Sequence, residues 1–212
     1  MNQDSASDVD SPWCDPSSIR ALFSAPRQVA PVREASVPRQ LRPAAVLVPL
    51  VARDGGITVL FTKRTDHLHH HPGQISFPGG RVEAHDESPV VAALRETTEE
   101  IGLDAGQVEL LGRLPDYQTG TGFNITPVVG LVAPPFELRL DEFEVAEAFE
   151  VPLGFLMDRR NQRLHSIVIE GQRRQYFAIP YGRHYIWGAT AGMLVTLRHF
   201  LRGEEDGPLS ED

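Results

Sequence analysis

The chain has 212 residues, a length typical of one domain with additional residues at its ends. Its formal net charge of −9 argues against a general nucleic-acid binder, because such a protein needs a basic surface to displace counterions from the phosphates. No apolar run approaches the roughly 20 residues of a membrane-spanning helix, the N-terminus lacks a basic-then-apolar signal pattern, and the single cysteine, Cys14, cannot form an internal disulfide. We therefore expect a cytoplasmic protein that associates with neither nucleic acid nor membrane. A homodimer is possible on the sequence alone.

The N-terminal part of the chain predicts an extension followed by a hairpin. Residues 1–38 are rich in Ser, Pro, Asp and Ala, which is typical of a loose arm, and only Ser18–Ser24 has a short helical pattern. Two apolar segments, Ala44–Ala52 and Ile57–Thr62, are then separated by an Asp-Gly-Gly turn. This arrangement predicts two antiparallel strands.

The rest of the chain alternates between helical and strand patterns. A helix is expected after a glycine-rich loop at Gly79 and Gly80, and a closing helix at Ile186–Leu201. Between them, strand patterns occur at Val108–Leu114, Ile125–Ala133, Leu164–Ile169 and Gln175–Ile179, the last two around Glu170-Gly171. We predict one α/β domain over residues 39–202 and a flexible acidic tail over residues 203–212.

The helix after the glycine-rich loop has well-defined ends. Ser88 is a good N-cap, Pro89 occupies the first helical position, where its missing N–H costs nothing, and Gly102 is a natural C-terminal stop. We predict a helix of about four turns between these residues.

Three carboxylates of this helix are expected to share one face. Glu96, Glu99 and Glu100 are spaced i, i+3, i+4, opposite a side that carries Val90, Leu94, Thr97 and Ile101. A solvated helix face is the ordinary interpretation, but like charges at this spacing repel by roughly 0.2–0.5 kcal/mol per pair. The last turn also disfavours acidic residues by roughly 0.3–1 kcal/mol. Together with the glycine-rich loop, these costs favour a site for a hard cation such as Mg²⁺ or Mn²⁺.

The same stretch resembles the signature of the Nudix hydrolases, "G…E…REUxEExGU" with U an aliphatic residue. The matching residues are Glu87, Arg95, Glu96, Glu99, Glu100, Gly102 and Leu103. Thr97 replaces the usual aliphatic residue, and one additional residue separates Gly80 from Glu87. The resemblance implies the Nudix fold, a mixed β-sheet sandwiched between α-helices, and hydrolysis of a diphosphate linked to another group.

The resemblance extends to the coenzyme A pyrophosphatase branch of these hydrolases, which shares the additional residue. The segment "VLFTKRTDHLHHHPGQISFPGG" (Val59–Gly80) is similar to the upstream signature of this branch, "LLTxRSxxLxxHxGQxxFPGG", with Thr65 in place of the serine. The segments "YQTGTGFNITPVVGLV", "EVAEAFEVPL" and "YIWGATAGML" are similar to its downstream parts. The resemblance covers about residues 40–202.

The resemblance also implies roles for individual residues. Glu96 and Glu100 would be the main metal ligands, Glu99 a further or water-mediated ligand, and the Gly80 carbonyl a neutral ligand. Arg95 would hold a carboxylate in place, either Glu87 or Glu99, although a surface salt bridge is the alternative for this arginine.

The general base has several candidates. It must be a carboxylate able to reach the attacking water, and in this family it comes from the helix or from a later loop. The candidates are Glu96 and Glu99 in the helix, then Glu144 and Glu147 in the later segment, for which a solvated loop is the alternative.

Candidate substrate contacts come from the upstream signature and from one later loop. Arg64, His71 and Gln74 match the signature, and Phe123 follows the "TGTG" loop. The run His67, His69, His70 and His71 suggests a metal site, but neighbouring histidines point in different directions and we expect His69 and His70 to be solvated.

The leading hypothesis is a Mg²⁺- or Mn²⁺-dependent enzyme that splits coenzyme A or its derivatives into 4′-phosphopantetheine and adenosine 3′,5′-bisphosphate. One alternative is a Nudix pyrophosphatase for another nucleoside diphosphate derivative, such as ADP-ribose or NADH. Another is a catalytically silent Nudix fold that only binds nucleotides. The three intact glutamates argue against this last alternative.

Overall fold

The computed structural model of the protein describes residues 15–27, 29–30, 37–68, 71–169 and 172–203. Cys14, His69, His70, the Glu170-Gly171 turn and almost all of the predicted acidic tail lie outside these residues. The helices are α1 (Pro16–Ser24), α2 (Pro89–Ile101), α3 (Leu153–Met157) and α4 (Ala189–Arg202), with short 3₁₀ turns at Ala105–Gln107 and Arg159–Asn161. The strands are β1 (Arg42–Arg53), β2 (Gly56–Arg64), β3 (Ile75–Ser76), β4 (Gly79–Arg81), β5 (Val108–Arg113), β6 (Tyr117–Gln118), β7 (Phe123–Val132), β8 (Val145–Pro152), β9 (Arg163–Ile169), β10 (Gln172–Tyr181) and β11 (His184–Trp187).

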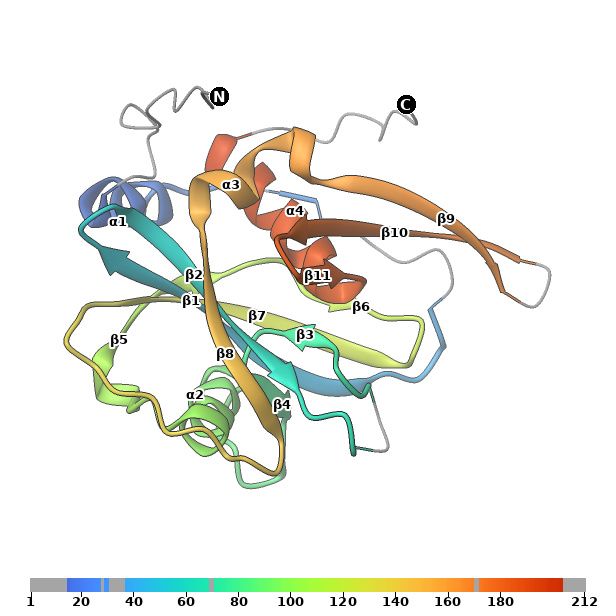
Figure 1. Cartoon of the computed structure of the whole chain (residues 1–212), viewed down its shortest axis with the longest axis horizontal. Coiled ribbons are helices and arrows are strands. Elements are labelled where there is room, and N and C mark those ends of the chain that lie inside the picture. Colours follow the sequence, from blue (N-terminus) through green and yellow to red (C-terminus); the bar gives the residue numbers. More distant parts are fainter. Residues whose placement is uncertain (1–14, 28, 31–36, 69–70, 170–171, 204–212) are drawn as a thin grey trace.

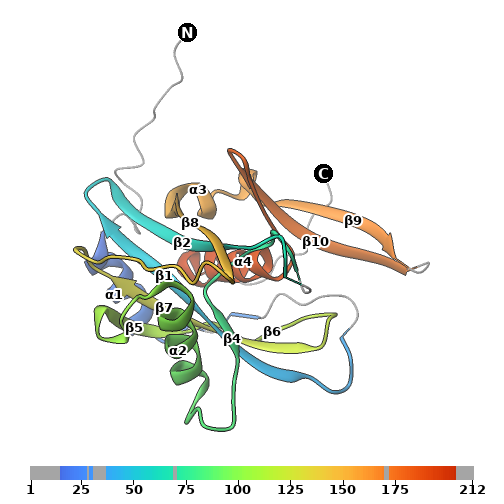
Figure 2. The same cartoon turned by 60° about the horizontal axis from the view of Figure 1, so that its bottom comes forward.

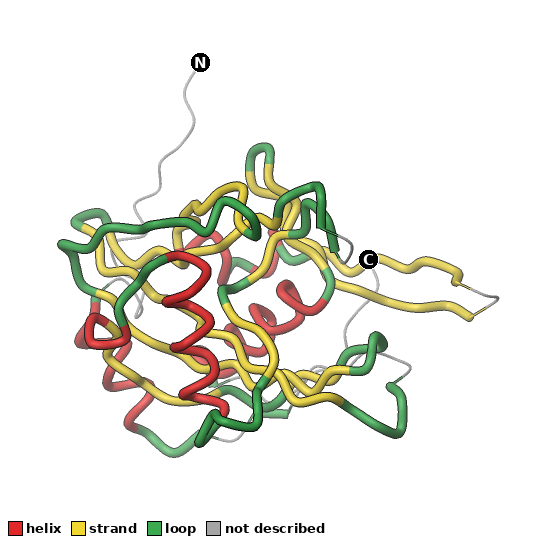
Figure 3. The backbone as a smooth tube through the Cα atoms, turned by 90° about the horizontal axis from the view of Figure 1, so that it is seen from below, coloured by secondary structure: helices red, strands yellow, loops and turns green. Residues whose placement is uncertain are grey.

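The strands of the described residues form two sheets (Figure 1). The larger is a mixed sheet with the order β3-β2-β1-β7-β5, to which β4, β6 and β8 add through β1, β7 and β2. β1 and β7 run parallel over ten residue pairs, from Arg42↔Phe123 to Val51↔Val132, and the predicted β1–β2 hairpin is antiparallel. The smaller sheet, β11-β10-β9, is antiparallel, and its β9–β10 hairpin projects from the body of the molecule (Figure 3).

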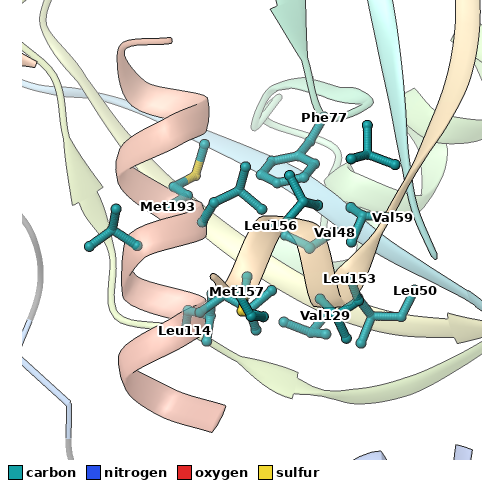
Figure 4. Close-up of a cluster of buried hydrophobic side chains, with 14 of the residues drawn as sticks. Val48, Leu50, Val59, Phe77, Leu114, Val129, Leu153, Leu156, Met157 and Met193 are labelled. Carbon is teal, nitrogen blue, oxygen red and sulfur yellow. The ribbon is translucent and has the colours of Figure 1, made fainter. Parts of the chain in front are cut away.

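Helices cover both faces of the larger sheet, as predicted (Figure 2). On one face, Ala45, Leu47 and Val51 of β1 belong to the cluster that packs against α2. On the other, Val48 and Leu50 join the cluster around α3 and α4, part of which Figure 4 shows. The central strands are apolar along their length because both of their faces are buried.

The short helix expected within the N-terminal extension is present as α1, which begins two residues earlier than predicted and packs against the body of the domain. Asp15 caps α1 by accepting hydrogen bonds from the N–H groups of Ser17 and Ser18. Ile19 is fully buried, and the ring of Phe23 lies 4.5 Å from that of Phe200 in α4. The apolar face of α1 completes the cluster around α4, and this burial holds the helix against the domain.

The closing helix begins later than expected. Ile186 lies in β11, where it pairs with Ile179 of β10, and α4 starts at Ala189. Gly188, with φ 65°, separates the two elements. An isolated apolar residue fits either a helix or a strand, so only the pairing with β10 decides the boundary.

A search of the described residues for membrane-spanning helices finds none with the required length and hydropathy.

Candidate functional site

The acidic helix α2 has the ends that its sequence predicts. The Ser88 hydroxyl accepts a hydrogen bond from the Val91 N–H, and Pro89 is the first helical residue. At the other end Gly102 adopts a left-handed conformation with φ 69° and donates its N–H to the Thr98 carbonyl. Thr97 is buried and donates its hydroxyl to the Ala93 carbonyl, so its polar group is satisfied within the helix.

Glu100 is buried, which corrects the expectation that all three glutamates lie on the face opposite the core. Its side chain is 7% exposed, and one carboxylate oxygen accepts a hydrogen bond from the Gly79 N–H at 3.2 Å. Burial raises the pKa of this carboxyl to about 8, although the Gly79 N–H and Arg64 oppose the shift. Glu100 borders the buried stripe of α2, and β4 covers it there.

Glu96 packs directly against the glycine pair of β4. A Cβ atom on Gly80 would lie 2.5 Å from the Glu96 carboxyl carbon, so only glycine permits this approach. Burial raises the pKa of Glu96, the Arg95 guanidinium opposes the shift, and the nearby charges of Glu99 and Glu144 add to it. The Glu96 carboxylate is therefore held beside the Gly80 backbone among other acidic groups.

Arg95 organises the loop before α2 and two of its glutamates. Its guanidinium donates to both carboxylate oxygens of Asp86, at 3.0 and 2.9 Å, to Glu96 at 2.9 Å and to Glu99 at 3.0 Å. The expected contact with Glu99 is therefore present, but Asp86 takes the place expected for Glu87. The Asp86 side chain is 1% exposed, because the loop turns it inward, where it also accepts a hydrogen bond from the Glu83 N–H.

Glu99 is the most exposed of the three glutamates. Its side chain is 60% accessible and pairs with Arg95. It borders the site and leaves its second oxygen open to solvent.

Glu144 approaches this group from a distant part of the chain. The Arg64 guanidinium, at the end of β2, lies 3.8 Å from a Glu100 oxygen and 3.9 Å from a Glu144 oxygen. Thr65 holds the loop that carries Glu144: its N–H donates to the Glu144 carbonyl at 3.0 Å and its hydroxyl to the Phe143 carbonyl at 2.8 Å. Sequence reasoning missed this role of Thr65, since a single threonine carries no signal of it.

Glu147 lies apart from the carboxylate group. It is part of β8, where a solvated loop was the alternative, and it accepts hydrogen bonds from Arg183 and from His184 near β11. Burial opposes the shift, but these two partners lower the pKa of Glu147. The structure therefore brings Glu144, and not Glu147, to the helix glutamates.

The upstream residues meet the site through their backbone. The Arg64 N–H donates to the Gln74 carbonyl, and the Gln74 N–H donates to the His71 carbonyl. His71 is exposed and has a positive φ of 55°, an unusual conformation for a residue other than glycine. This turn positions His71 and Gln74 next to Arg64. His67 contacts the Phe143 ring, with centroids 4.8 Å apart.

Phe123 lies at the first position of β7, half-buried, beside two arginines that the sequence did not single out. The guanidinium carbon of Arg42 is 4.1 Å from its ring centroid, and that of Arg81 is 6.0 Å away.

The side chains suit a hard cation by their chemistry. The donors are all oxygens, and the glycine pair allows Glu96 to approach the Gly80 backbone. Among the residues that the structure describes, no group of three or more His, Cys, Asp or Glu side chains is already arranged to hold a metal ion. Instead, Arg95 holds Glu96 and Glu99, while Arg64 lies between Glu100 and Glu144. A cation would take over the neutralising role of these guanidinium groups.

Comparisons with known proteins agree with this geometry. The model of the NUDIX domain matches residues 41–161. The chain is 42% identical over 158 residues to the uncharacterized Nudix hydrolase NudL of Enterobacter sp. (strain 638), covering 74% of this chain and 81% of that relative. It is 39% identical over 156 residues to NudL of Escherichia coli (strain K12 / DH10B), with the same coverage of both chains.

A solved structure, the Nudix hydrolase RenU from M. smegmatis, superposes with a TM-score of 0.54 at 22% identity, covering 81% of this chain and 90% of that one. This likeness concerns the fold alone. Nudix hydrolases generally use divalent metal ions and act on nucleotide-type small molecules. With the family model covering more than half of the sequence, the chain belongs to the Nudix family and is a pyrophosphatase of the Nudix type.

Proposed function

We propose that this protein hydrolyses the diphosphate bond of coenzyme A or its derivatives to 4′-phosphopantetheine and adenosine 3′,5′-bisphosphate. The observation that carries the proposal is the meeting of two separate motifs. Arg64, from the segment that resembles the coenzyme A branch, lies 3.8 Å from Glu100 of the acidic helix. This proximity supports a single site for the residues expected to select the substrate and those expected to hydrolyse it.

Hydrolysis of a diphosphate requires positive charges that neutralise the anionic oxygens of the substrate. Held by Glu96, Glu99, Glu100 and the Gly80 carbonyl, Mg²⁺ or Mn²⁺ would supply charge neutralisation of the diphosphate oxygens and acidification of water. Arg95 positions Glu96 and Glu99 from one side, anchored by Asp86. Arg64 adds a positive charge beside Glu100 that can contact a phosphate oxygen.

Glu144 is our choice for the general base. Its side chain is 44% exposed, which leaves it free to accept a proton from the attacking water, and it faces the helix glutamates across Arg64. Glu96 and Glu99 stay as alternatives within the helix. Both are hydrogen-bonded to Arg95, so one oxygen of each carboxylate already has a partner.

Chromatographic product analysis tests the proposal. The protein is incubated with coenzyme A, ADP-ribose and NADH, each with Mg²⁺, Mn²⁺ or a chelator. We expect 4′-phosphopantetheine and adenosine 3′,5′-bisphosphate to form fastest, and only with metal. Faster hydrolysis of ADP-ribose or NADH would refute the coenzyme A assignment, and no hydrolysis of any substrate would favour the nucleotide-binding alternative.

The role of Arg64 in substrate choice has its own test. Arg64→Ala should raise KM for coenzyme A more than KM for NADH, because this arginine belongs to the segment typical of the coenzyme A branch. Equal increases for both substrates would limit Arg64 to a general contact with phosphate.

A further inference from the structure

A second positively charged group lies on the strands that border the carboxylate site, on the face of the sheet opposite α2. Three strands each contribute one side chain to it: β1 Arg42, β7 Phe123 and β4 Arg81. The two guanidinium groups approach the same aromatic ring, at 4.1 and 6.0 Å from its centroid. We call these three residues the arginine–phenylalanine cluster.

The register of the sheet produces this cluster. Arg42 is the pairing partner of Phe123 in the parallel β1–β7 ladder, and Arg81 is the partner of Ala44 in the β1–β4 ladder. Residues 42 and 44 of β1 point to the same face, so the three side chains share it. The Phe123 N–H donates to the Thr119 hydroxyl, which fixes the ring at the start of β7.

Within the part of the chain that the structure describes, no carboxylate forms an ion pair with the two arginines of the cluster. Some exposed arginines pair with carboxylates, as Arg20 does with Glu109 and Arg53 with Glu150. Arg42 and Arg81 are both exposed, and neither makes an ion pair with any described residue; Arg42 donates only to the Thr121 carbonyl. Two like charges beside one ring repel each other, and an anion between them would remove that repulsion. In a chain with a formal net charge of −9, the two guanidinium groups form a local concentration of positive charge.

The position of the cluster connects it to the substrate. Arg81 follows Gly80 directly, and its carbonyl accepts a hydrogen bond from Arg95 at 3.2 Å. Successive side chains of a strand alternate between faces, so the Arg81 side chain lies on the face of the sheet opposite Gly80 and the Glu96 carboxylate, one residue further along β4. A substrate that passes over β4 could present its diphosphate on one side of this strand and a second anionic group on the other.

We propose that Arg42 and Arg81 bind a phosphate monoester of the substrate, separate from the diphosphate that is hydrolysed. The inference rests on the proposed function, in which the nucleoside part of the substrate carries such a phosphate. Phe123 holds the two guanidinium groups in position through its ring face. The cluster thereby selects nucleotides with an additional phosphate.

A matched pair of substrates tests this site. Coenzyme A and 3′-dephospho-coenzyme A differ only in the monoester. Arg42→Ala and Arg81→Ala should each raise KM for coenzyme A by about tenfold or more, the effect of one charge-assisted hydrogen bond, and change KM for 3′-dephospho-coenzyme A less than twofold. Arg53→Ala is the control: Arg53 lies at the other end of β1, also over an aromatic ring, Phe136 at 5.1 Å, and should change neither KM. Equal effects on both substrates would overturn the proposal.

Calorimetric binding in the presence of a chelator separates this proposal from the proposed function. Adenosine 3′,5′-bisphosphate should bind at least about tenfold more tightly than adenosine 5′-monophosphate, Arg81→Ala should remove the difference, and Arg81→Lys should restore part of it. If coenzyme A is not hydrolysed but this preference is found, the proposed function fails and the phosphate site stands. Equal binding of the two nucleotides to the unmodified protein would overturn the phosphate site.

Discussion

At the scale of single residues, the burial of Glu100 is the feature with the sharpest consequence. Glu100→Gln should lower kcat by more than about 100-fold, beyond the usual effect of residues that only support metal ligands. The fold should be retained, because the glutamine oxygen can still accept the Gly79 N–H. Steady-state kinetics and thermal unfolding measure the two effects.

The matched control for Glu100 is Glu109→Gln. Glu109 is exposed on β5, where it pairs with Arg20, and its replacement should leave kcat unchanged. A Glu100→Gln enzyme that retains metal-dependent activity would refute the assignment of this residue.

Thr65 is a positioning residue, since it holds the loop of Glu144 without entering the carboxylate group. Thr65→Val removes the hydroxyl donor to the Phe143 carbonyl but keeps the backbone bond to Glu144. Loss of one hydrogen bond of about 0.5–1.5 kcal/mol should lower kcat up to about tenfold. Thr65→Ser should restore the rate, because it restores the donor. If valine and serine behave alike in kinetic assays, the loop does not depend on this hydroxyl.

At the scale of elements, the pairing of Asp86 with Arg95 joins the loop after β4 to helix α2. Hydrogen bonds from Arg95 lower the pKa of Asp86 to about 2. The pairing therefore stabilises the fold fully above the ordinary pKa of 3.8, and this contribution is lost as pH falls toward 2. Asp86→Asn should unfold at a lower temperature than the unmodified protein at pH 7, and the difference should shrink below pH 3.8.

The adjacent Glu87 provides the control for this prediction. Glu87 belongs to the family signature and is exposed, and no hydrogen bond between it and Arg95 is present. Glu87→Gln should leave the unfolding temperature unchanged at both pH values. A larger loss of stability for Glu87→Gln than for Asp86→Asn would show that the loop is anchored differently in solution.

The elements also show which local signals were sufficient. The caps of α2 and the Asp-Gly-Gly turn predicted their elements because the stabilising contacts lie within a few residues. Ser88, Pro89 and Gly102 all have the predicted roles. The short strands β3, β4 and β6 carried no such signal, because two or three residues pair only where a longer strand is already present.

At the scale of the whole molecule, a divalent cation should stabilise the fold by neutralising the carboxylates around Glu96 and Glu100. A ligand at ten times its dissociation constant adds about 1.4 kcal/mol to the free energy of unfolding, which raises Tm by a few degrees for a chain of this size. Thermal unfolding with Mg²⁺, Mn²⁺ or chelator at equal ionic strength measures this shift. The double variant Glu96→Gln, Glu100→Gln should show no shift. An unchanged Tm of the unmodified protein at saturating metal would argue against a metal site here.

By itself, the sequence determined the class of the fold, the boundaries of the acidic helix and the identity of its glutamates, because periodicity and caps are local properties. The tertiary structure decided which side chains meet. Glu144 approaches Arg64 while Glu147 contacts His184, although the two glutamates are only three positions apart in the sequence. The long parallel ladder of β1 and β7 aligns Arg42 with Phe123 from segments some eighty residues apart. Such encounters depend on strand register and on which face each residue occupies, and these are properties of the assembled sheet.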